Sequence, residues 1–495
     1  MLWLLACVAP ATHPGDAPPA DSATTWSDSG QHASDSAESG LPASYPVFTP
    51  PSDASDQLGV YHWDPDLGAW PGTPDVLTWG ADSAAAMGAR TLRLTLSARD
   101  DYDGANLGNV ALVDIAASEN WAPVLANPSF DTVLLTTYTE ADIESVWSDG
   151  YWADEATAER DAIAALGTWL LTNAPGRTFI LLNWEGDNAM ASWKGDAVAW
   201  QGYRDWVEAR VEGVEAARAA VPDSTARLYS GLEFNAVDDL QTGEACGSAP
   251  LDCVLSEVAP TARVDVYSYS SWQTAAFDVP DDQLAAHVSD ALDRIDAALA
   301  ASHPDLARQD ILIGEYGAGR DIYDECRDAT RSAAIGTAAL DWGAGLAIHW
   351  QLYDNPGVQT VYGFGLMDRD GRRTLSGDWL ANWWATGLAV DIPDSCGSIN
   401  DGGICDGTTW DDQIIPGDAI SIFGSGFSTT GNTVHFDADG ALSTAGAGTP
   451  WWYESEGQIN VTLPTSIGPA TGLRVWVSSP QGYESNTGRI NVLAP

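Results

Sequence analysis

Short apolar segments alternate with longer stretches of helical spacing from Gln57 to about residue 390. Eight of the apolar segments predict strands: Leu58–Trp63, Thr91–Leu96, Thr132–Tyr138, Phe179–Trp184, Arg227–Phe234, Val264–Ser270, Ile311–Tyr316 and Leu346–Leu352. Four of the stretches between them predict helices: Glu155–Thr172, Ala197–Ala220, Asp281–Ala301 and Glu325–Trp342. This alternation is typical of parallel β/α architecture. Eight such units predict a (β/α)8 TIM barrel. The main alternative is a doubly wound sheet, but no GxGxxG or GxxxxGK[ST] loop follows any of the predicted strands.

The pattern changes after the predicted barrel, which we place at residues 45–390. Residues 391–412 are rich in Gly and Asp and predict a linker, whereas 413–495 carry short alternating strands separated by turns, as in a β-sandwich. The segments PGDAISIFGSGFS, GQINVTLP and SPQGYESN in this last part resemble the IPT/TIG immunoglobulin-like domains. That resemblance implies a small all-β immunoglobulin-like sandwich of the kind found in surface proteins and beside polysaccharide-active enzymes.

The first 44 residues predict a truncated lipoprotein-type signal and a disordered tether. Leu4-Leu5-Ala6-Cys7 resembles the bacterial lipobox, which implies lipid attachment at Cys7, although the basic n-region is missing and a chance match stays open. Residues 11–42 are mainly Ala, Pro, Asp, Ser and Thr, which cannot form a core. We therefore expect an extracytoplasmic protein, either secreted or lipid-anchored at the cell surface.

The cysteines favour an oxidising compartment. The short spacings predict disulfides Cys246–Cys253 and Cys396–Cys405 and leave Cys326 unpaired in a helix. Zinc is the weaker alternative, because no CxxC pair or His-rich cluster accompanies them.

Charge narrows the choice of partner. Asp and Glu outnumber Lys and Arg by 70 to 21, which gives a net charge of -49. Such a polyanion is repelled by nucleic acid and by anionic membranes, whereas a neutral carbohydrate is unaffected. We expect no cofactor and no metal. Asp100, Asp101 and Asp103 could bind calcium, but a solvated acidic loop is the favoured interpretation.

Reactive side chains gather where the predicted barrel strands end, which is where barrel enzymes build their sites. The fourth strand leads into Glu185 and the seventh into Glu315. Carboxylates at these two places face each other across a barrel mouth. Glycosidic bond cleavage needs such a pair, with one carboxyl protonated and the other ionised.

These strand ends resemble the clan of retaining glycoside hydrolases with cellulase-like (β/α)8 barrels. The resemblance implies that Glu185 is the acid/base and that Glu315, in the segment GEYG, is the nucleophile. It also implies a substrate site that includes Arg93 of the second strand, a tyrosine pair on the sixth and a sugar-stacking tryptophan on the eighth. With neighbouring residues, the expected substrate-binding set is Arg93, Asn183, Asp187, Asn188, Tyr267, Tyr269, Trp272 and Trp350.

One departure from the clan leaves alternatives open. The clan has Asn directly before the acid/base Glu, but here Trp184 lies between Asn183 and Glu185. A local bulge could restore the geometry, or Asn188 could replace the missing contact. Asp187 is an alternative acid, followed by Glu233.

Two hypotheses follow. The first is a retaining glycoside hydrolase acting on a polysaccharide or glycoside through two glutamates. The second is a non-catalytic surface protein with a degenerate barrel that binds glycans.

Overall fold

The computed structural model describes residues 47–494 with internal gaps. The gaps are 64–74, 98–101, 103–109, 140–145, 148, 238–251, 276–278, 321, 354–362, 368–371, 389–391, 393–397, 407–412, 426, 428–430, 439–440, 447–450, 454–455, 481 and 486–487. The predicted lipid site Cys7, the tether, and the acidic positions Asp100, Asp101 and Asp103 lie outside the described residues.

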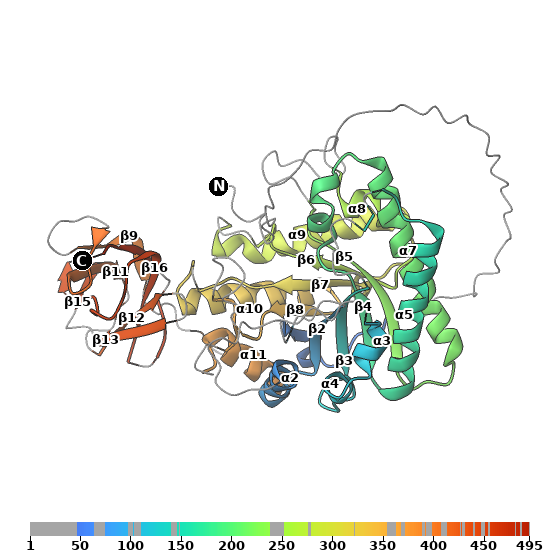
Figure 1. The fold of residues 1–495 in the computed structure, drawn as a ribbon, viewed down its shortest axis with the longest axis horizontal. Helices are drawn as coiled ribbons and strands as arrows, with labels where there is room; N and C mark the ends of the chain where they lie inside the picture. Colours follow the sequence, from blue (N-terminus) through green and yellow to red (C-terminus); the bar gives the residue numbers. More distant parts are fainter. Residues whose placement is uncertain are drawn as a thin grey trace. The chain divides into compact units, whose positions relative to one another are not determined.

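Eight parallel strands close into one barrel in sequence order, which confirms the TIM-barrel prediction (Figure 1). Closure is made by β1 and β8, where Val60 pairs with His349. The strands are β1 (Leu58–Tyr61), β2 (Thr91–Ser97), β3 (Thr132–Tyr138), β4 (Thr178–Leu182), β5 (Arg227–Phe234), β6 (Val266–Ser270), β7 (Ile311–Tyr316) and β8 (Ala347–Trp350). Three of them, β3, β5 and β7, have the predicted bounds at both ends.

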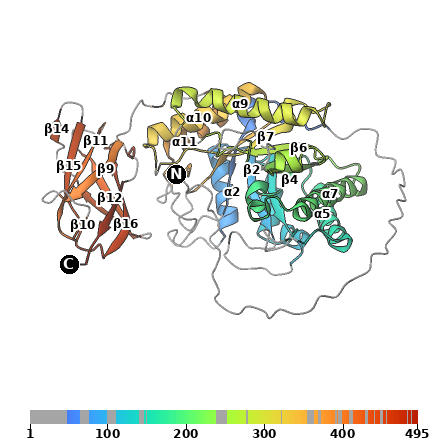
Figure 2. The same cartoon turned by 90° about the horizontal axis from the view of Figure 1, so that it is seen from above.

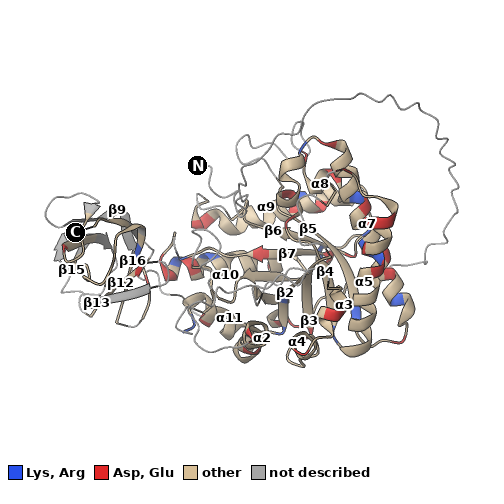
Figure 3. Ribbon diagram, in the orientation of Figure 1, with Lys and Arg blue, Asp and Glu red and all other residues tan. Residues whose placement is uncertain are grey.

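Helices surround the barrel, and they carry many of the charged residues (Figures 2 and 3). The α-helices are α1 (Ala54–Gln57), α2 (Val76–Met87), α3 (Leu112–Ala116), α4 (Trp121–Leu125), α5 (Ala153–Asn173), α6 (Gly186–Ala189), α7 (Ala197–Ala220), α8 (Val254–Glu257), α9 (Asp281–Ala300), α10 (Glu325–Trp342) and α11 (Leu375–Thr386). Two 3-10 turns, η2 (Ala191–Trp193) and η3 (Arg308–Asp310), lie between them.

Local capping explains why α7 and α10 begin where the sequence predicts. Asp196 accepts hydrogen bonds from two backbone amides in the first turn of α7, and Asp324 does the same for α10. Each cap satisfies amide groups that have no partner within the helix. Gly343 then ends α10 in the left-handed conformation that glycine adopts most easily.

The barrel interior is apolar near the amino ends of the strands and polar near their carboxyl ends. The apolar layer contains Tyr229, Leu134, Ile180, Leu182, Val266, Leu312, Leu346 and Ile348. Phe48 closes this end and packs edge-on against Tyr229, with ring centroids 5.2 Å apart. Above it the interior side chains include Arg93, Thr136, Glu233 and Ser268, which are fully or almost fully buried. Burial of these polar groups requires that they bond to one another.

The C-terminal part forms two sheets, one of five strands ordered β10-β17-β16-β12-β13 and one of four ordered β14-β15-β11-β9. Their strands are β9 (Ser398–Asp406), β10 (Gln413–Ile414), β11 (Ala419–Ser425), β12 (Thr433–Ala438), β13 (Ala441–Gly446), β14 (Trp451–Tyr453), β15 (Glu456–Thr462), β16 (Ala470–Ser478) and β17 (Gly488–Val492). Side chains of both sheets, such as Ile422 of β11 and Phe436 of β12, belong to one hydrophobic cluster. The immunoglobulin-like identity of this part remains a prediction.

The cysteines correct one prediction. Cys326 is buried in α10 as expected, but it is disulfide-bonded and not unpaired; Cys253 is disulfide-bonded as well. Spacing alone missed this because a disulfide depends on the distance between Cβ atoms, not on separation along the chain. Cys246 and Cys396 lie outside the described residues, and the side chain of Cys405 is not described, so both predicted pairings remain predictions.

Among the described helices, none is long and apolar enough to cross a bilayer.

Candidate active site

A β-bulge in β7 turns Glu315 into the barrel mouth. Leu312 faces the interior, and Ile311 and Ile313 face the helices, as strict alternation requires. Continued alternation would point Glu315 outward. However, Tyr269 and Ser270 of β6 are consecutive and pair with Ile313 and Glu315, so β7 has one extra residue at Gly314. The same extra residue appears on the β8 side. Bulges re-aim side chains in this way beside active sites.

Gly314 is required at the bulge because its Cα lies against the polar cluster. A Cβ atom there would lie 2.0 Å from a carboxylate oxygen of Glu233 and 2.2 Å from the Ser268 hydroxyl. The Gly314 carbonyl also accepts a 3.0 Å hydrogen bond from Arg93. A larger residue would therefore displace the groups that surround the site.

An irregular turn positions Glu185 after β4. Among the described non-glycine residues, Glu185 is the one with positive φ, at 24°. Such conformations cost energy and concentrate at functional sites. The strand ends at Leu182 rather than at the predicted Trp184, because the chain turns here into the short helix α6. This turn carries Glu185 into the barrel mouth, where Ser270 contacts both Glu185 and Glu315.

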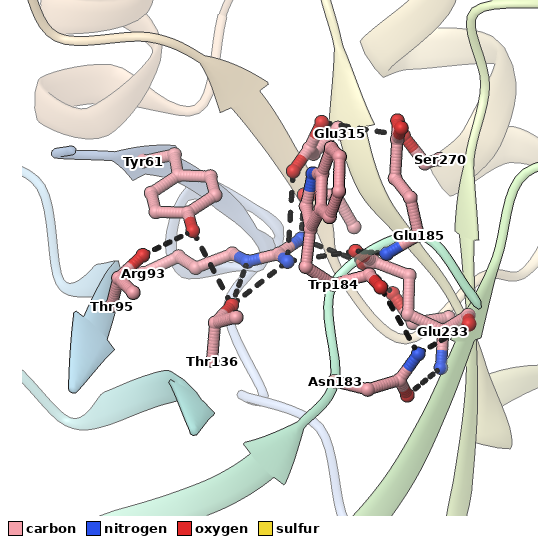
Figure 4. Close-up of polar contacts among 12 residues, drawn as sticks. Tyr61, Arg93, Thr95, Thr136, Asn183, Trp184, Glu185, Glu233, Ser270 and Glu315 are labelled. Atoms are coloured by element: carbon pink, nitrogen blue, oxygen red, sulfur yellow. Dashed lines mark hydrogen bonds and ion pairs between the residues drawn. The ribbon is translucent and has the colours of Figure 1, made fainter. Parts of the chain in front are cut away.

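A single buried serine joins the two glutamates (Figure 4). The Ser270 hydroxyl lies 2.5 Å from Glu185 Oε1 and 3.3 Å from Glu315 Oε2. These two carboxylate oxygens are therefore at most about 6 Å apart. Asn188 donates a hydrogen bond to the other oxygen of Glu185, and the Trp272 indole donates one of 3.1 Å to Glu315 Oε2. Glu315 Oε1 accepts no hydrogen bond from the described residues.

A second buried network lies directly below the pair. Arg93 donates two hydrogen bonds, of 2.6 and 2.7 Å, to the carboxylate of Glu233. Its guanidinium also lies 3.6 Å from Glu315 Oε1 and bonds to the hydroxyl of Thr136. Ser268 donates to Glu233 as well. Arg93 thus neutralises one carboxylate fully and reaches a second, which places a fixed positive charge beside Glu315.

Burial raises the pKa of both glutamates. The pKa of Glu185 rises to about 7, chiefly through desolvation, and the Glu233 carboxylate adds to the shift. Desolvation also raises the pKa of Glu315 well above its usual range; the Arg93 guanidinium opposes that rise, and the Glu185 and Glu233 carboxylates add to it. Two carboxyls this close hold protons as a unit. The arrangement can keep one proton on the pair near neutral pH.

The predicted tyrosine pair does not belong to the site. The hydroxyl of Tyr267 donates to the Ala262 carbonyl, 2.7 Å away, and Tyr269 bonds to Thr274. Both rings pack in the cluster between strands and helices. Alternation along β6 explains the correction, because the interior positions are Ser268 and Ser270.

Asn183 and Asp187 also serve the scaffold instead of the pocket. The Asn183 amide exchanges two hydrogen bonds, each of 2.7 Å, with the backbone of Glu233. The Asp187 carboxylate accepts from the backbone amides of Asn235, Ala236 and Val254. Their polar atoms are occupied by the main chain, so neither is placed to contact a substrate, and Asp187 is not placed to act as the acid.

Aromatic rings flank the glutamates. Trp350 packs edge-on against Tyr61, at 4.8 Å between ring centroids, and lies 5.4 Å from the ring of Trp63. Trp272 packs edge-on against Phe364 at 5.2 Å. Trp350 and Trp272 are both partly exposed, so they can offer flat apolar faces to a sugar ring.

Two parts of the site were not predicted from the sequence. Ser270 was overlooked because a serine in a strand gives no chemical signal until its neighbours are known. Glu233 was considered only as an alternative acid, although its interior position on β5 and the buried Arg93 could have suggested an ion pair.

Among the described residues, no group of three or more His, Cys, Asp or Glu side chains could hold a metal ion.

Comparisons with known proteins give distant likenesses only. No protein-family model matches the chain, and no curated protein is detectably similar to it. Among solved structures, it resembles the Bacteroides uniformis beta-glucuronidase 2 covalently bound to cyclophellitol-6-carboxylate aziridine, with TM-score 0.42, 11% identity, and coverage of 89% of this chain and 46% of that one. It also resembles the family 1 β-glucosidase of Thermotoga maritima, with TM-score 0.44, 14% identity and coverage of 68% and 98%. A family 39 glycoside hydrolase from Bacteroides cellulosilyticus WH2 gives TM-score 0.39, 10% identity and coverage of 85% and 81%.

The chain spans about half the length of the Bacteroides uniformis structure. At such identities and TM-scores these likenesses carry no weight for activity. A functional assignment must therefore stand on the geometry of the site.

Proposed function

We propose that this chain is a retaining glycoside hydrolase that cleaves O-glycosidic bonds of a polysaccharide or glycoside. The observation that carries the proposal is the buried pair Glu185 and Glu315, held within reach of one serine hydroxyl at the barrel mouth. Burying two carboxyls this close together is unfavourable unless a shared proton or a nearby positive charge neutralises them. Double displacement on a sugar uses such a pair.

The roles follow from the charges around each glutamate. Glu315 lies beside Arg93, which favours its ionised form, and its Oε1 is free to attack. Glu185 has its pKa raised to about 7 and can hold the proton that the leaving oxygen needs. Glu315 Oε1 forms a bond to the anomeric carbon as the glycosidic bond breaks, and the Glu185 proton goes to the departing oxygen.

The second step reverses these transfers. Ionised Glu185 takes a proton from water, and the water oxygen bonds to the anomeric carbon while the bond to Glu315 breaks. The anomeric configuration is thereby retained. The short separation supports retention, because the two oxygens that contact Ser270 lie at most about 6 Å apart and retaining pairs place their carboxyl groups roughly 5–5.5 Å apart.

The test is turnover of a panel of aryl glycosides, with the configuration of the first-formed sugar followed by NMR. We expect retention in the wild type and loss of turnover in Glu315→Gln. Asn382→Gln, at a partly exposed position of α11, is the control that should keep activity. Glycan binding without turnover across the panel would overturn the proposal and favour a non-catalytic glycan-binding protein.

We further propose an extracytoplasmic location and an IPT/TIG-like C-terminal domain. Disulfide bonding of Cys253 and Cys326 supports an oxidising compartment. The two C-terminal sheets with a common hydrophobic cluster support the second assignment. Non-reducing gels of the exported protein, compared with cytoplasmic expression, test the compartment.

A further inference from the structure

We propose that Ser270 is a positioning residue that carries the hydrogen bond between the two glutamates and thereby fixes which of them holds the shared proton. This inference rests on the proposed function, because it assigns a role within the same site. Ser270 is fully buried and contacts both carboxyls, at 2.5 Å from Glu185 Oε1 and 3.3 Å from Glu315 Oε2.

The donor count at Ser270 allows few arrangements. A serine hydroxyl donates one hydrogen bond and accepts others, while ionised carboxylates only accept. If both glutamates were ionised, one of the two contacts would lack a hydrogen. With one proton on the pair, both contacts are satisfied: Glu185 Oε1–H donates to Ser270, and Ser270 donates to Glu315 Oε2.

Neighbouring groups favour this arrangement over the opposite one, in which Glu315 holds the proton and Glu185 carries the negative charge. Arg93 lies 3.6 Å from Glu315 Oε1 and the Trp272 N–H donates to Oε2, so Glu315 is the better place for the negative charge. The opposite assignment would put that charge on Glu185, which has no such contact with Arg93 among the described residues.

The other titratable groups around the pair keep their charges fixed. Arg93 is held cationic by Glu233, and burial raises the pKa of Tyr61 to about 12, so its phenol stays neutral. The proton therefore exchanges between Glu185 and Glu315 only.

The same hydroxyl serves the second half of the reaction. Once Glu315 is esterified and Glu185 has lost its proton, rotation about the Ser270 Cβ–Oγ bond lets the hydroxyl donate to the Glu185 carboxylate. That carboxylate is then ready to accept a proton from water. The Ser270 hydroxyl would thus change its hydrogen-bond acceptor during the reaction while its own protonation stays the same.

The experiment compares Ser270→Ala with Ser270→Thr, which keeps a hydroxyl, and with Ser271→Ala. Ser271 is the matched control, since it is equally buried but its hydroxyl bonds to the main-chain carbonyl of Glu315. The first readout is the infrared band of protonated carboxyl groups, titrated without substrate and assigned with Glu185→Gln and Glu315→Gln. The second is the pH profile of kcat/KM on an aryl glycoside.

In Ser270→Ala we expect the pKa of Glu315 to rise and that of Glu185 to fall, which narrows the pH profile by about one unit. Ser270→Thr should restore the wild-type profile. Ser271→Ala should lower stability without shifting either limb of the pH profile of kcat/KM. Unchanged carboxyl titration in folded Ser270→Ala would overturn the bridge while leaving hydrolase activity intact. A Ser270-dependent titration in a protein that turns over no glycoside would instead overturn the proposed function alone.

Discussion

The two ends of the barrel interior are built from the same eight strands yet hold opposite kinds of contact. Near the amino ends, aliphatic side chains such as Leu312 and Ile348 fill the space, and Phe48 seals it. Near the carboxyl ends, Arg93, Glu233 and Glu315 lie almost without solvent contact. The first end is held by burial of apolar surface, which has no preferred direction. The second end depends on directional hydrogen bonds and ion pairs, so the loss of one side chain there leaves the groups that it contacts without a partner.

Arg93→Met gives the largest expected change. It leaves the Glu233 carboxylate buried without its partner, so we expect a loss of about 3–5 kcal/mol of unfolding free energy. Urea unfolding measures it. Adding Glu233→Gln should recover much of the loss, since both charges are then gone; a double variant no more stable than the single one would contradict this explanation.

Leu312→Ala probes the apolar end. The cavity should cost about 2–5 kcal/mol of unfolding free energy. Because no charged group is touched, the pH profile of kcat/KM should keep both limbs in place. A shift of either limb of the profile would show that the apolar and polar ends of the barrel are coupled.

Gly314→Ala tests the bulge between the two ends. The added methyl group overlaps the Glu233 carboxylate and Ser268, which should cost about 1–3 kcal/mol of stability and about 100-fold in kcat/KM. Gly468→Ala is the control, because a Cβ there meets nothing within 4 Å. Equal behaviour of the two variants would show that the bulge has no special requirement for glycine.

The smallest expected effect is on the pH dependence of stability. Burial raises the pKa of native Glu185 to about 7, whereas an unfolded glutamate releases its proton near pH 4.5. The native state therefore binds more protons between these values, so stability falls as the pH rises through this window. Glu185→Gln should flatten the fall by roughly 1–2 kcal/mol. Thermal unfolding at pH 4.5 and 7 measures it, and equal slopes in both proteins would refute the buried-proton assignment.

The scaffold was largely predictable from the sequence. Hydrophobic periodicity predicted all eight strands, with β3, β5 and β7 correct at both ends, and the caps Asp196 and Asp324 account for helix starts that match prediction. These features depend on neighbours within a few residues, which a sequence displays directly.

The site was predicted only in part. Glu185, Glu315 and Arg93 were named and are brought together, whereas Tyr267 and Tyr269 were expected in the pocket and face the helices. The choice between odd and even positions of β6 depends on which face meets the barrel axis. A one-residue difference in register exchanges the two sets of side chains.

The sequence by itself determined that eight β/α units would form a barrel with carboxylates at two strand ends, because periodicity and strand order are local properties of the chain. Only the tertiary structure decided how those carboxylates meet. An extra residue at Gly314 and a positive φ at Glu185 turn both side chains off the regular alternation, and Ser270 lies between them. Such departures are stable only when distant strands surround them, so no single stretch of sequence could reveal them.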